Sequence, residues 1–327
     1  MTKTNNTRIA FYGTMPYDRK TFDKINEDFG FEIKYFTGNI SKDNLILAKG
    51  CRAVCVFVND NVDAEALREL KEYGVELIAL RCAGFNNVDL EAARQLGIRV
   101  VRVPAYSPYA VAEYAVALML SLNRKIQRAS WRTRDGNFSL NGLLGFDMHG
   151  KTVGIIGTGK IAKVLVGILR GFGMKILAYD VYPDYAFAEA NDVKYVTLDE
   201  LYNGSDIISL HCPLTPETEY IINSESIAKM KRGVMIVNTG RGLLINSEDL
   251  IDGLKSGQVG FAALDVYEEE ANYFFRDKSD RIIEDDTLAR LLSFNNVIMT
   301  SHQAFFTAEA TDNIAKTTLG NILDYIE

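Results

Sequence analysis

The chain has 327 residues, of which 47% are hydrophobic and 24% are charged, and this composition excludes a disordered or fibrous protein. At roughly 150 residues per domain, the length predicts two domains, each large enough to bury its own core. The 43 acidic and 36 basic side chains leave a net charge of −7, and no long run of Lys or Arg concentrates positive charge. The sequence therefore disfavours a nucleic-acid partner.

The N-terminal residues and the cysteines indicate a compartment. The opening segment, MTKTNNTRIAFYG, contains no apolar core of the signal-peptide type. The longest apolar stretch, residues 110–122, includes Glu113 and is too short to span a bilayer. The cysteines show neither a zinc-binding spacing nor a C-x-x-C pair, which favours reduced thiols at Cys51, Cys55, Cys82 and Cys212. We expect a soluble, cytoplasmic protein with no membrane partner and no metal site.

Short β-branched runs alternate with helical patterns in the first third of the chain. Apolar residues at three- and four-residue spacing predict a helix through Phe22, Ile25 and Phe29, and further helices are expected at 63–73 and 89–96. Strands are predicted at residues 8–12, 31–36, 53–58, 76–80 and 98–101. The near-continuously apolar strands favour a parallel sheet that is covered on both faces.

A second series follows a long helix predicted at 107–129. Its six strands are predicted at 152–156, 175–179, 206–210, 234–237, 260–264 and 297–299, and a last helix at 307–325 has no strand of this series left to follow it. The sequence thus predicts an α/β protein with two doubly wound parallel sheets, Rossmann-like and flavodoxin-like. We expect one domain to comprise residues 1–103 and 301–327, and the other residues 104–300.

The sharpest motif is HGKTVGIIGTGKIAKVLVGIL, in which G-x-G-x-x-A lies between a predicted strand and a predicted helix. Gly157 allows the tight turn, Gly159 lacks the Cβ that would block a pyrophosphate, and Ala162 lets the helix approach the sheet. The backbone amides of Lys160 and Ile161 lie in the first helical turn, where an anion is stabilised. Alone, this motif is often an ordinary turn, but its strand–turn–helix context indicates a dinucleotide site.

An acidic residue follows the glycine turn at the expected distance. Asp180 ends the next predicted strand, KILAYD, where its carboxylate can accept hydrogen bonds from an adenosine ribose. The same charge would repel a 2′-phosphate, and no Arg follows it. The sequence therefore predicts NAD rather than NADP.

Three charged residues follow three different strands of the second series. Arg241 comes after VMIVN, Glu270 after FAALD and His302 after VIMTS, and the ends of parallel strands meet at one edge of the sheet. Such a set suits reduction of a 2-keto acid. The Arg holds the carboxylate, the His donates a proton to the carbonyl oxygen, and the Glu favours the protonated imidazole.

Each of these residues also has an ordinary structural interpretation. Arg at a sheet edge is usually a surface residue, Glu270 lies in a run of three acids typical of a solvated face, and a single His is more often structural than catalytic. Their joint occurrence downstream of the glycine turn favours the functional interpretation. His149 and His211 have no partner that the sequence reveals, and we expect both to be structural.

With these residues in place, the sequence resembles the D-2-hydroxyacid dehydrogenase family along essentially its whole length. The general family motifs are HGKTVGIIGTGKIA, LHCPLTPETEYIIN and KMKRGVMIVNTGRGLLINSEDL. Segments that resemble the fermentative D-lactate dehydrogenase branch are YSPYAVAEYAV, ALDVYEEEANYFFRDKSDRIIEDDTLARLL and SHQAFFTAEA. This resemblance implies reversible reduction of pyruvate to D-lactate by NADH, an active-site cleft between the domains, and a homo-oligomer, either dimer or tetramer.

The resemblance also implies a role for individual residues. Arg241 would anchor the substrate carboxylate, Glu270 would be the partner of the histidine, and His302 would be the proton donor. The implied cofactor-binding residues are Gly157, Gly159, Lys160, Ile161, Asp180, Cys212, Pro213, Thr218, Thr239, Gly240, Arg241 and Asp265, with Asp265 near the nicotinamide amide. The implied substrate-binding residues are Ala83, Gly84, Tyr106, Arg241, His302 and Phe305.

Two alternatives remain open at this point. One is a dehydrogenase for another D-2-hydroxy acid, although Phe57 and Val62 are apolar and no additional Arg nearby could hold a second carboxylate. The other is a non-catalytic NAD-sensing protein, since the same fold serves transcriptional corepressors. Those carry long extensions, whereas this sequence ends shortly after Tyr325.

Overall fold

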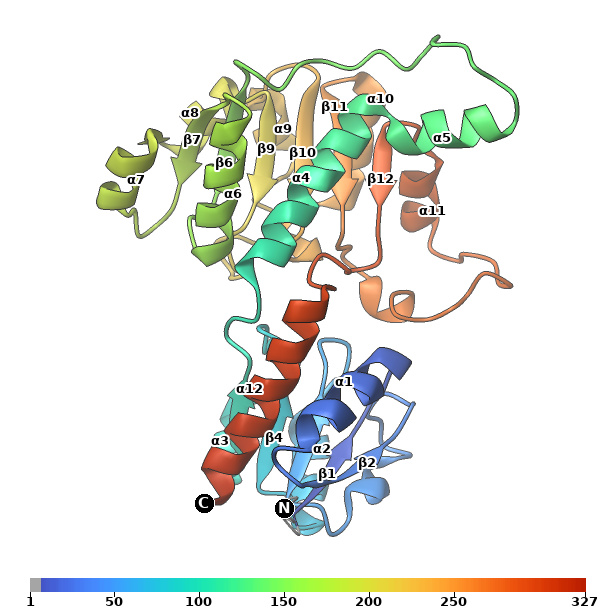
Figure 1. Cartoon of the computed structure of the whole chain (residues 1–327), viewed down its shortest axis with the longest axis vertical. Coiled ribbons are helices and arrows are strands. Elements are labelled where there is room, and N and C mark those ends of the chain that lie inside the picture. Colours follow the sequence, from blue (N-terminus) through green and yellow to red (C-terminus); the bar gives the residue numbers. More distant parts are fainter. Residues whose placement is uncertain (1–6) are drawn as a thin grey trace. The chain divides into compact units, whose positions relative to one another are not determined.

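The computed structural model describes residues 7–327, which form two compact units, each built on its own parallel sheet (Figure 1). The first unit runs to Ser107 and includes Phe306–Glu327, and the second is Pro108–Phe305. Both changeovers lie a few residues after the positions expected from the sequence. The prediction of two doubly wound α/β domains is confirmed.

The first unit contains five strands in the order β2-β1-β3-β4-β5, all parallel. Their bounds are β1 Arg8–Phe11, β2 Glu32–Tyr35, β3 Ala53–Val56, β4 Leu77–Leu80 and β5 Arg99–Arg102. Its helical elements are α1 Pro16–Asn26, η1 Leu45–Ala48, α2 Ala64–Glu72, α3 Leu90–Gln95 and α12 Ala308–Ile326. Helix α12, the last of the chain, packs against α1 and β4, so two segments far apart in sequence lie side by side.

The second unit contains seven parallel strands in the order β12-β11-β10-β9-β6-β7-β8. Their bounds are β6 Thr152–Ile156, β7 Lys175–Tyr179, β8 Val193–Tyr195, β9 Ile207–Leu210, β10 Val234–Asn238, β11 Val259–Leu264 and β12 Val297–Met299. The chain starts in the middle at β6, moves to one edge, then returns to β9 on the other side of β6. This reversal is the point at which doubly wound sheets bind their ligands, beyond the carboxyl ends of the strands.

Helices cover both faces of the second sheet. The elements are α4 Pro108–Arg124, α5 Ile126–Arg134, α6 Lys160–Gly171, α7 Tyr185–Asn191, α8 Leu198–Gly204, α9 Ser224–Lys229, η2 Gly242–Leu244, α10 Ser247–Ser256, η3 Glu270–Asn272 and α11 Asp286–Ser293. Apolar residues of α4 and α6 form one core with the sheet, and those of α8, α9, α10 and α11 form a second core on the opposite face (Figure 1). Burial on both faces explains why the strands are apolar at nearly every position.

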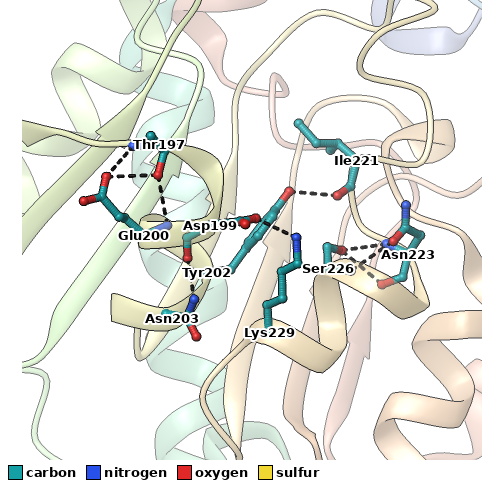
Figure 2. A network of polar contacts seen from close by, with 9 residues as sticks. All are labelled: Thr197, Asp199, Glu200, Tyr202, Asn203, Ile221, Asn223, Ser226 and Lys229. Atoms are coloured by element: carbon teal, nitrogen blue, oxygen red, sulfur yellow. Dashed lines mark hydrogen bonds and ion pairs between the residues drawn. The ribbon is translucent and has the colours of Figure 1, made fainter.

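Helices α8 and α9 are joined by polar contacts at the second core's surface (Figure 2). Thr197 and Glu200 form a capping box at the start of α8, in which each side chain accepts from the other residue's backbone amide. Asp199 of α8 accepts a hydrogen bond from Lys229 of α9 at 2.7 Å. These contacts hold the two short helices against each other.

Three elements differ from the sequence-based expectation. Helix α1 ends at Asn26, so Phe29, which was predicted to be helical, lies in the turn that follows. The predicted helix at 107–129 is two helices, because Lys125 adopts a left-handed conformation with φ +52° that α4 cannot continue through. The seventh strand, β8, was not predicted. It has three residues at the sheet edge and carries too little apolar pattern to be recognised.

Three further findings concern the part of the chain that the structure describes. No helix within it is long and apolar enough to cross a membrane. All four cysteines are free thiols. No cluster of three or more His, Cys, Asp or Glu side chains among residues 7–327 could hold a metal ion.

Candidate active site

The glycine turn lies between β6 and α6, at the centre of the second sheet. Gly157 has φ +91°, and a Cβ there would lie 2.5 Å from the Cys212 backbone nitrogen. Gly159 is the N-cap of α6 and has φ −67°. Residues other than glycine also adopt this backbone conformation. A Cβ at Gly159 would meet no heavy atom within 4 Å, which leaves open space directly in front of the helix amides. This open cradle fits a pyrophosphate group.

Asp180 follows β7 and is held in a network around the same turn. Its Oδ2 accepts hydrogen bonds from the Thr158 backbone amide at 2.6 Å and from the Thr158 hydroxyl at 2.9 Å. Its Oδ1 accepts from the Tyr182 amide at 2.9 Å. Partial burial raises the pKa of Asp180, but the hydrogen bonds from Thr158 and Tyr182 outweigh burial and lower the pKa below its ordinary value. The carboxylate is therefore a fixed negative charge beside the turn, where it suits ribose hydroxyls and opposes a 2′-phosphate.

The turns after β9 and β10 form the next part of this edge. The Thr218 hydroxyl donates to the Pro213 carbonyl at 2.6 Å and closes the loop after β9. Burial raises the pKa of Cys212 to about 11, so this residue is a neutral thiol at physiological pH. In the turn after β10, Gly240 donates its amide to Asn238 at 3.0 Å.

The side chain of Thr239 contains a buried polar atom to which no residue among 7–327 forms a hydrogen bond. Its hydroxyl oxygen is buried without a hydrogen-bond partner. Buried hydroxyls are almost always paired in proteins, so an unpaired one at a ligand-binding edge is a position for a ligand atom. Together with the open space at Gly159, this fits a bound dinucleotide.

His302 and Glu270 form a direct pair. The His302 Nδ1 lies 2.7 Å from the Glu270 Oε1. Because a carboxylate only accepts hydrogen bonds, Nδ1 is the donor, which leaves Nε2 as the atom that can exchange a proton with a substrate. Glu270 is itself held, since its Oε2 accepts from the Tyr267 amide at 3.1 Å.

Asp265 anchors the loop that carries His302. Its buried carboxylate accepts hydrogen bonds from the Thr300 hydroxyl at 2.6 Å and from the amides of Gln303 and Ala304 at 2.9 and 2.8 Å. The His302 amide donates to the Asp265 carbonyl at 2.6 Å. Burial raises the pKa of Asp265, although these hydrogen bonds oppose it. The sequence did not reveal this anchoring role, because it depends on how the loop after β12 turns back over β11.

Arg241 follows β10, so the three charged residues come from β10, β11 and β12, which are neighbours in the sheet. The half-buried Arg241 side chain donates from Nη1 to the Gly240 carbonyl at 2.8 Å. At the adjacent Gly242, a Cβ would lie 2.1 Å from the Tyr267 carbonyl, so only glycine allows the turn after β10 to approach the segment that leads to Glu270. This close approach aligns two of the three strand ends that carry the charged residues.

In the first unit, the predicted substrate residues Ala83 and Gly84 lie in the loop after β4, and Tyr106 follows β5. The Arg102 guanidinium donates to the Ala83 carbonyl at 2.6 Å, and the Cys82 thiol donates to the Gly84 carbonyl at 3.3 Å. The carbonyls of Ala83 and Gly84 are thus both hydrogen-bonded within the first unit. Tyr106, also predicted, accepts a hydrogen bond at its carbonyl from Asn313 at 2.8 Å. Phe305 is buried in the second unit, three residues after His302.

A buried charge cluster beneath that loop was not predicted. Arg81 is buried, donates to the Gly13 carbonyl at 2.9 Å and lies 3.6 Å from the Asp18 carboxylate. Its guanidinium stacks over Phe11 at 4.4 Å and Phe57 at 5.0 Å. The sequence does not indicate this cluster, because a single Arg after a strand is usually a surface residue.

The two remaining histidines differ in their surroundings. His211 has a partner that the sequence did not reveal, because its Nε2 lies 2.8 Å from the Ser209 hydroxyl. Burial lowers the pKa of His211 to about 4, so the ring is neutral at physiological pH. His149 is exposed and packs its ring next to Gly173.

Comparison with known proteins adds independent information. Residues 116–304 match the family described as D-isomer specific 2-hydroxyacid dehydrogenase, NAD binding domain. The chain is 54% identical over 315 residues to the D-lactate dehydrogenase of Escherichia coli, covering 96% of this chain and 95% of that protein.

Solved structures agree with this match along the whole chain. A pyruvate reductase of Chlamydomonas reinhardtii has a TM-score of 0.93 at 46% identity, covering 100% of this chain and 98% of that one. A D-lactate dehydrogenase of Aquifex aeolicus, solved with NAD and lactic acid, has a TM-score of 0.86 at 32% identity, covering 97% of this chain and 95% of that one.

Proposed function

The chain belongs to the D-isomer specific 2-hydroxyacid dehydrogenase family, whose NAD-binding domain it contains, and we propose that it is a D-lactate dehydrogenase that reduces pyruvate. The observation that carries this proposal is the 2.7 Å pair between His302 and Glu270, at strand ends adjacent to the one that carries Arg241. The relatives named above act on lactate or pyruvate by their names, which supports the choice of substrate.

In this proposal, three residues of the second unit have different roles in the reaction. Arg241 binds the substrate carboxylate through its guanidinium, which orients the keto group. His302 donates the Nε2 proton to the carbonyl oxygen as the carbonyl carbon is reduced, and it accepts that proton in the reverse direction. Glu270 holds Nδ1–H and stabilises the protonated imidazole before transfer. NAD, when bound, supplies or accepts the hydride.

The cofactor and the substrate have further contacts in this proposal. Gly157, Gly159, Lys160 and Ile161 bind the pyrophosphate, and Asp180 binds the adenosine ribose. The rest of the cofactor contacts Cys212, Pro213, Thr218, Thr239, Gly240 and Asp265. In the first unit, the backbone amides of Ala83 and Gly84 and the side chain of Tyr106 are substrate contacts in this proposal. In the second unit, Phe305 is a substrate contact.

We also propose a cytoplasmic homo-oligomer. Free thiols at all four cysteines are consistent with a reducing compartment. Large apolar side chains on α5 and the segment after it are exposed, among them Trp131 at 68% and Leu144 at 89%, which favours burial against a second copy. Light scattering coupled to size-exclusion chromatography measures the mass, and a monomer at micromolar concentration would contradict the oligomer.

The activity is tested by following NADH absorbance with pyruvate, 2-ketoglutarate and phenylpyruvate, and by offering D- and L-lactate with NAD. We expect the highest kcat/KM for pyruvate and oxidation of D-lactate alone. A large preference for one of the bulkier keto acids would make the chain a dehydrogenase for another D-2-hydroxy acid. Absence of turnover with every substrate, together with NADH binding, would favour a non-catalytic NAD-sensing protein.

A further inference from the structure

Two residues with left-handed backbone conformations face each other at the site. His302 has φ +53° and Phe275 has φ +63°, and their ring centroids lie 5.8 Å apart with the ring planes tilted by 38°. Left-handed conformations are costly for residues with bulky side chains, and they persist where the surroundings impose them. Such residues cluster at functional sites, so this contact requires an explanation.

Among residues 7–327, two hydrogen bonds hold His302, and neither of them fixes the plane of its ring. The backbone amide is bonded to the Asp265 carbonyl, which fixes the position of the residue. The bond from Nδ1 to Glu270 fixes one ring nitrogen, but the ring can still tilt about that bond. A tilt moves Nε2, the atom on the opposite side of the ring. The ring of Phe275, packed against the imidazole, restricts this tilt.

Phe275 comes from the same short segment that supplies Glu270. The amides of Tyr273 and Phe274 donate to the Glu270 carbonyl at 3.0 and 2.8 Å, which closes a tight turn. Phe274 is buried in the core formed with α8, α9, α10 and α11. Phe275 is partly buried at the border of the same core, and with its left-handed conformation its ring also contacts the ring of His302. One turn thus provides both the carboxylate on Nδ1 and the aromatic contact on the ring.

The far end of this segment is also fixed. The Tyr267 hydroxyl donates to the Asp285 carboxylate at 2.8 Å, and the Asp285 amide donates to the Tyr273 hydroxyl at 3.0 Å. Both tyrosines flank the turn that contains Glu270. The turn is therefore braced from outside, and this bracing can maintain the strained conformation of Phe275.

We propose that Phe275 is a positioning residue for proton transfer, which holds the imidazole plane of His302 so that Nε2 points at the carbonyl oxygen of the substrate. The proposal rests on the function proposed above. In the step concerned, the Nε2–H bond breaks and an O–H bond forms, while the carbonyl carbon takes a hydride from NADH. Small misplacements of a reacting group cost as much as about 100-fold in rate, so loss of the aromatic contact should slow this step.

Three substitutions at Phe275 distinguish the effect of its aromatic ring from the effect of its left-handed backbone conformation. Phe275→Tyr keeps an aromatic ring, Phe275→Leu keeps apolar bulk without a flat face, and Phe275→Asn removes the ring but tolerates the left-handed conformation. We expect Leu and Asn to lower kcat by about 10- to 100-fold, with KM for pyruvate and Kd for NADH nearly unchanged, and Tyr to restore most of kcat. The solvent deuterium isotope effect on kcat should increase in the Leu and Asn variants, because proton transfer becomes more rate-limiting.

Phe274→Leu is the matched control, since it removes the neighbouring ring from the core. It should lower the thermal midpoint and leave the isotope effect at its wild-type value. If Phe275→Leu and Phe275→Asn retain wild-type kcat and isotope effect, the proposal is overturned. The same holds if Phe274→Leu reproduces their kinetic changes, because the effect would then be structural.

A measurement without turnover distinguishes failure of this inference from failure of the proposed function. NMR signals of the His302 ring, recorded in the NADH complex with labelled histidine, report the ring orientation whether or not pyruvate is the substrate. We expect Phe275→Leu to shift and broaden these signals and Phe275→Tyr to leave them close to wild type. Unchanged signals in Phe275→Leu would overturn the inference, whereas absence of pyruvate reduction in the wild type would overturn only the function.

Discussion

Substitution of Arg241 tests how the substrate carboxylate is bound. Its planar guanidinium can form two parallel hydrogen bonds with a carboxylate, and the ammonium of a lysine cannot. Loss of one charge-assisted hydrogen bond is worth roughly 1.5–3 kcal/mol, so Arg241→Lys should raise KM for pyruvate by about 10- to 100-fold and change Kd for NADH little. Steady-state kinetics and inhibition by oxamate measure this. An unchanged KM together with an unchanged oxamate inhibition constant would remove Arg241 from the substrate site.

His302 tests the proton transfer itself. His302→Ala removes the donor to the carbonyl oxygen, and a general acid of this kind contributes typically about 10²–10⁴-fold in rate. We expect kcat to fall within that range while NADH binding, followed by fluorescence titration, stays near wild type. Glu270→Gln is the companion variant, since it retains a hydrogen-bonding partner for Nδ1 but removes the charge. Near-wild-type turnover by His302→Ala would show that another group donates the proton.

At this residue scale, hydrophobic pattern singled out Arg241, Glu270 and His302 as candidates, whereas the contacts that hold His302 in place were not predicted. Arg241 and His302 lie three residues after β10 and β12, and Glu270 lies six residues after β11; the ends of these apolar strands are recognisable from hydrophobic pattern. Asp265 as an anchor, and the contact between Phe275 and His302, follow from turns with unusual backbone conformations. No local pattern predicts a left-handed conformation at a Phe or a His.

At the scale of elements, the turn between β6 and α6 offers a matched pair of glycines. Gly157→Ala forces a Cβ into a left-handed position 2.5 Å from the Cys212 backbone, so we expect it to lower the thermal midpoint. Gly159→Ala meets open space and a favourable φ, so the protein should fold with near-wild-type stability. Its methyl group then occupies the proposed pyrophosphate position, and Kd for NADH should rise by about 10-fold or more.

Thermal unfolding and NADH titration of both glycine variants separate the two roles. If Gly159→Ala binds NADH as tightly as the wild type, the pyrophosphate does not lie at this turn. If Gly157→Ala is as stable as the wild type, the strain argument at the turn is wrong.

The elements also show what limits prediction from sequence. Buried apolar strands such as β6, β9 and β10 were predicted to within one residue at each end, because burial on both faces leaves a continuous apolar run. The three-residue edge strand β8 was missed, and the break between α4 and α5 at Lys125 was read as continuous helix. Both depend on tertiary packing that overrides a weak local signal.

At the scale of the whole molecule, buried titratable groups make stability depend on pH in opposite directions. Burial raises the pKa of the Asp18 and Asp265 carboxyls, so each contributes stability that is lost as the pH rises through its range. Burial lowers the pKa of His211 to about 4, so the unfolded chain binds a proton there more readily than the folded protein. Acidification therefore destabilises the fold through His211 while the buried carboxyls oppose the change.

The contribution of His211 to the pH dependence of the unfolding free energy can be measured by substitution. Its stabilising contribution is complete above the unfolded pKa of about 6.5 and is lost as the pH falls toward about 4, with a slope that approaches about 1.4 kcal/mol per pH unit. We expect His211→Gln, which can still bond to Ser209, to flatten the dependence of unfolding free energy on pH over that window. Urea unfolding of both proteins at pH 7 and pH 5 gives the difference, in which the carboxyl contributions cancel. Equal losses of stability in wild type and variant would mean that His211 is protonated in the folded protein and that its ring is not desolvated beside Ser209.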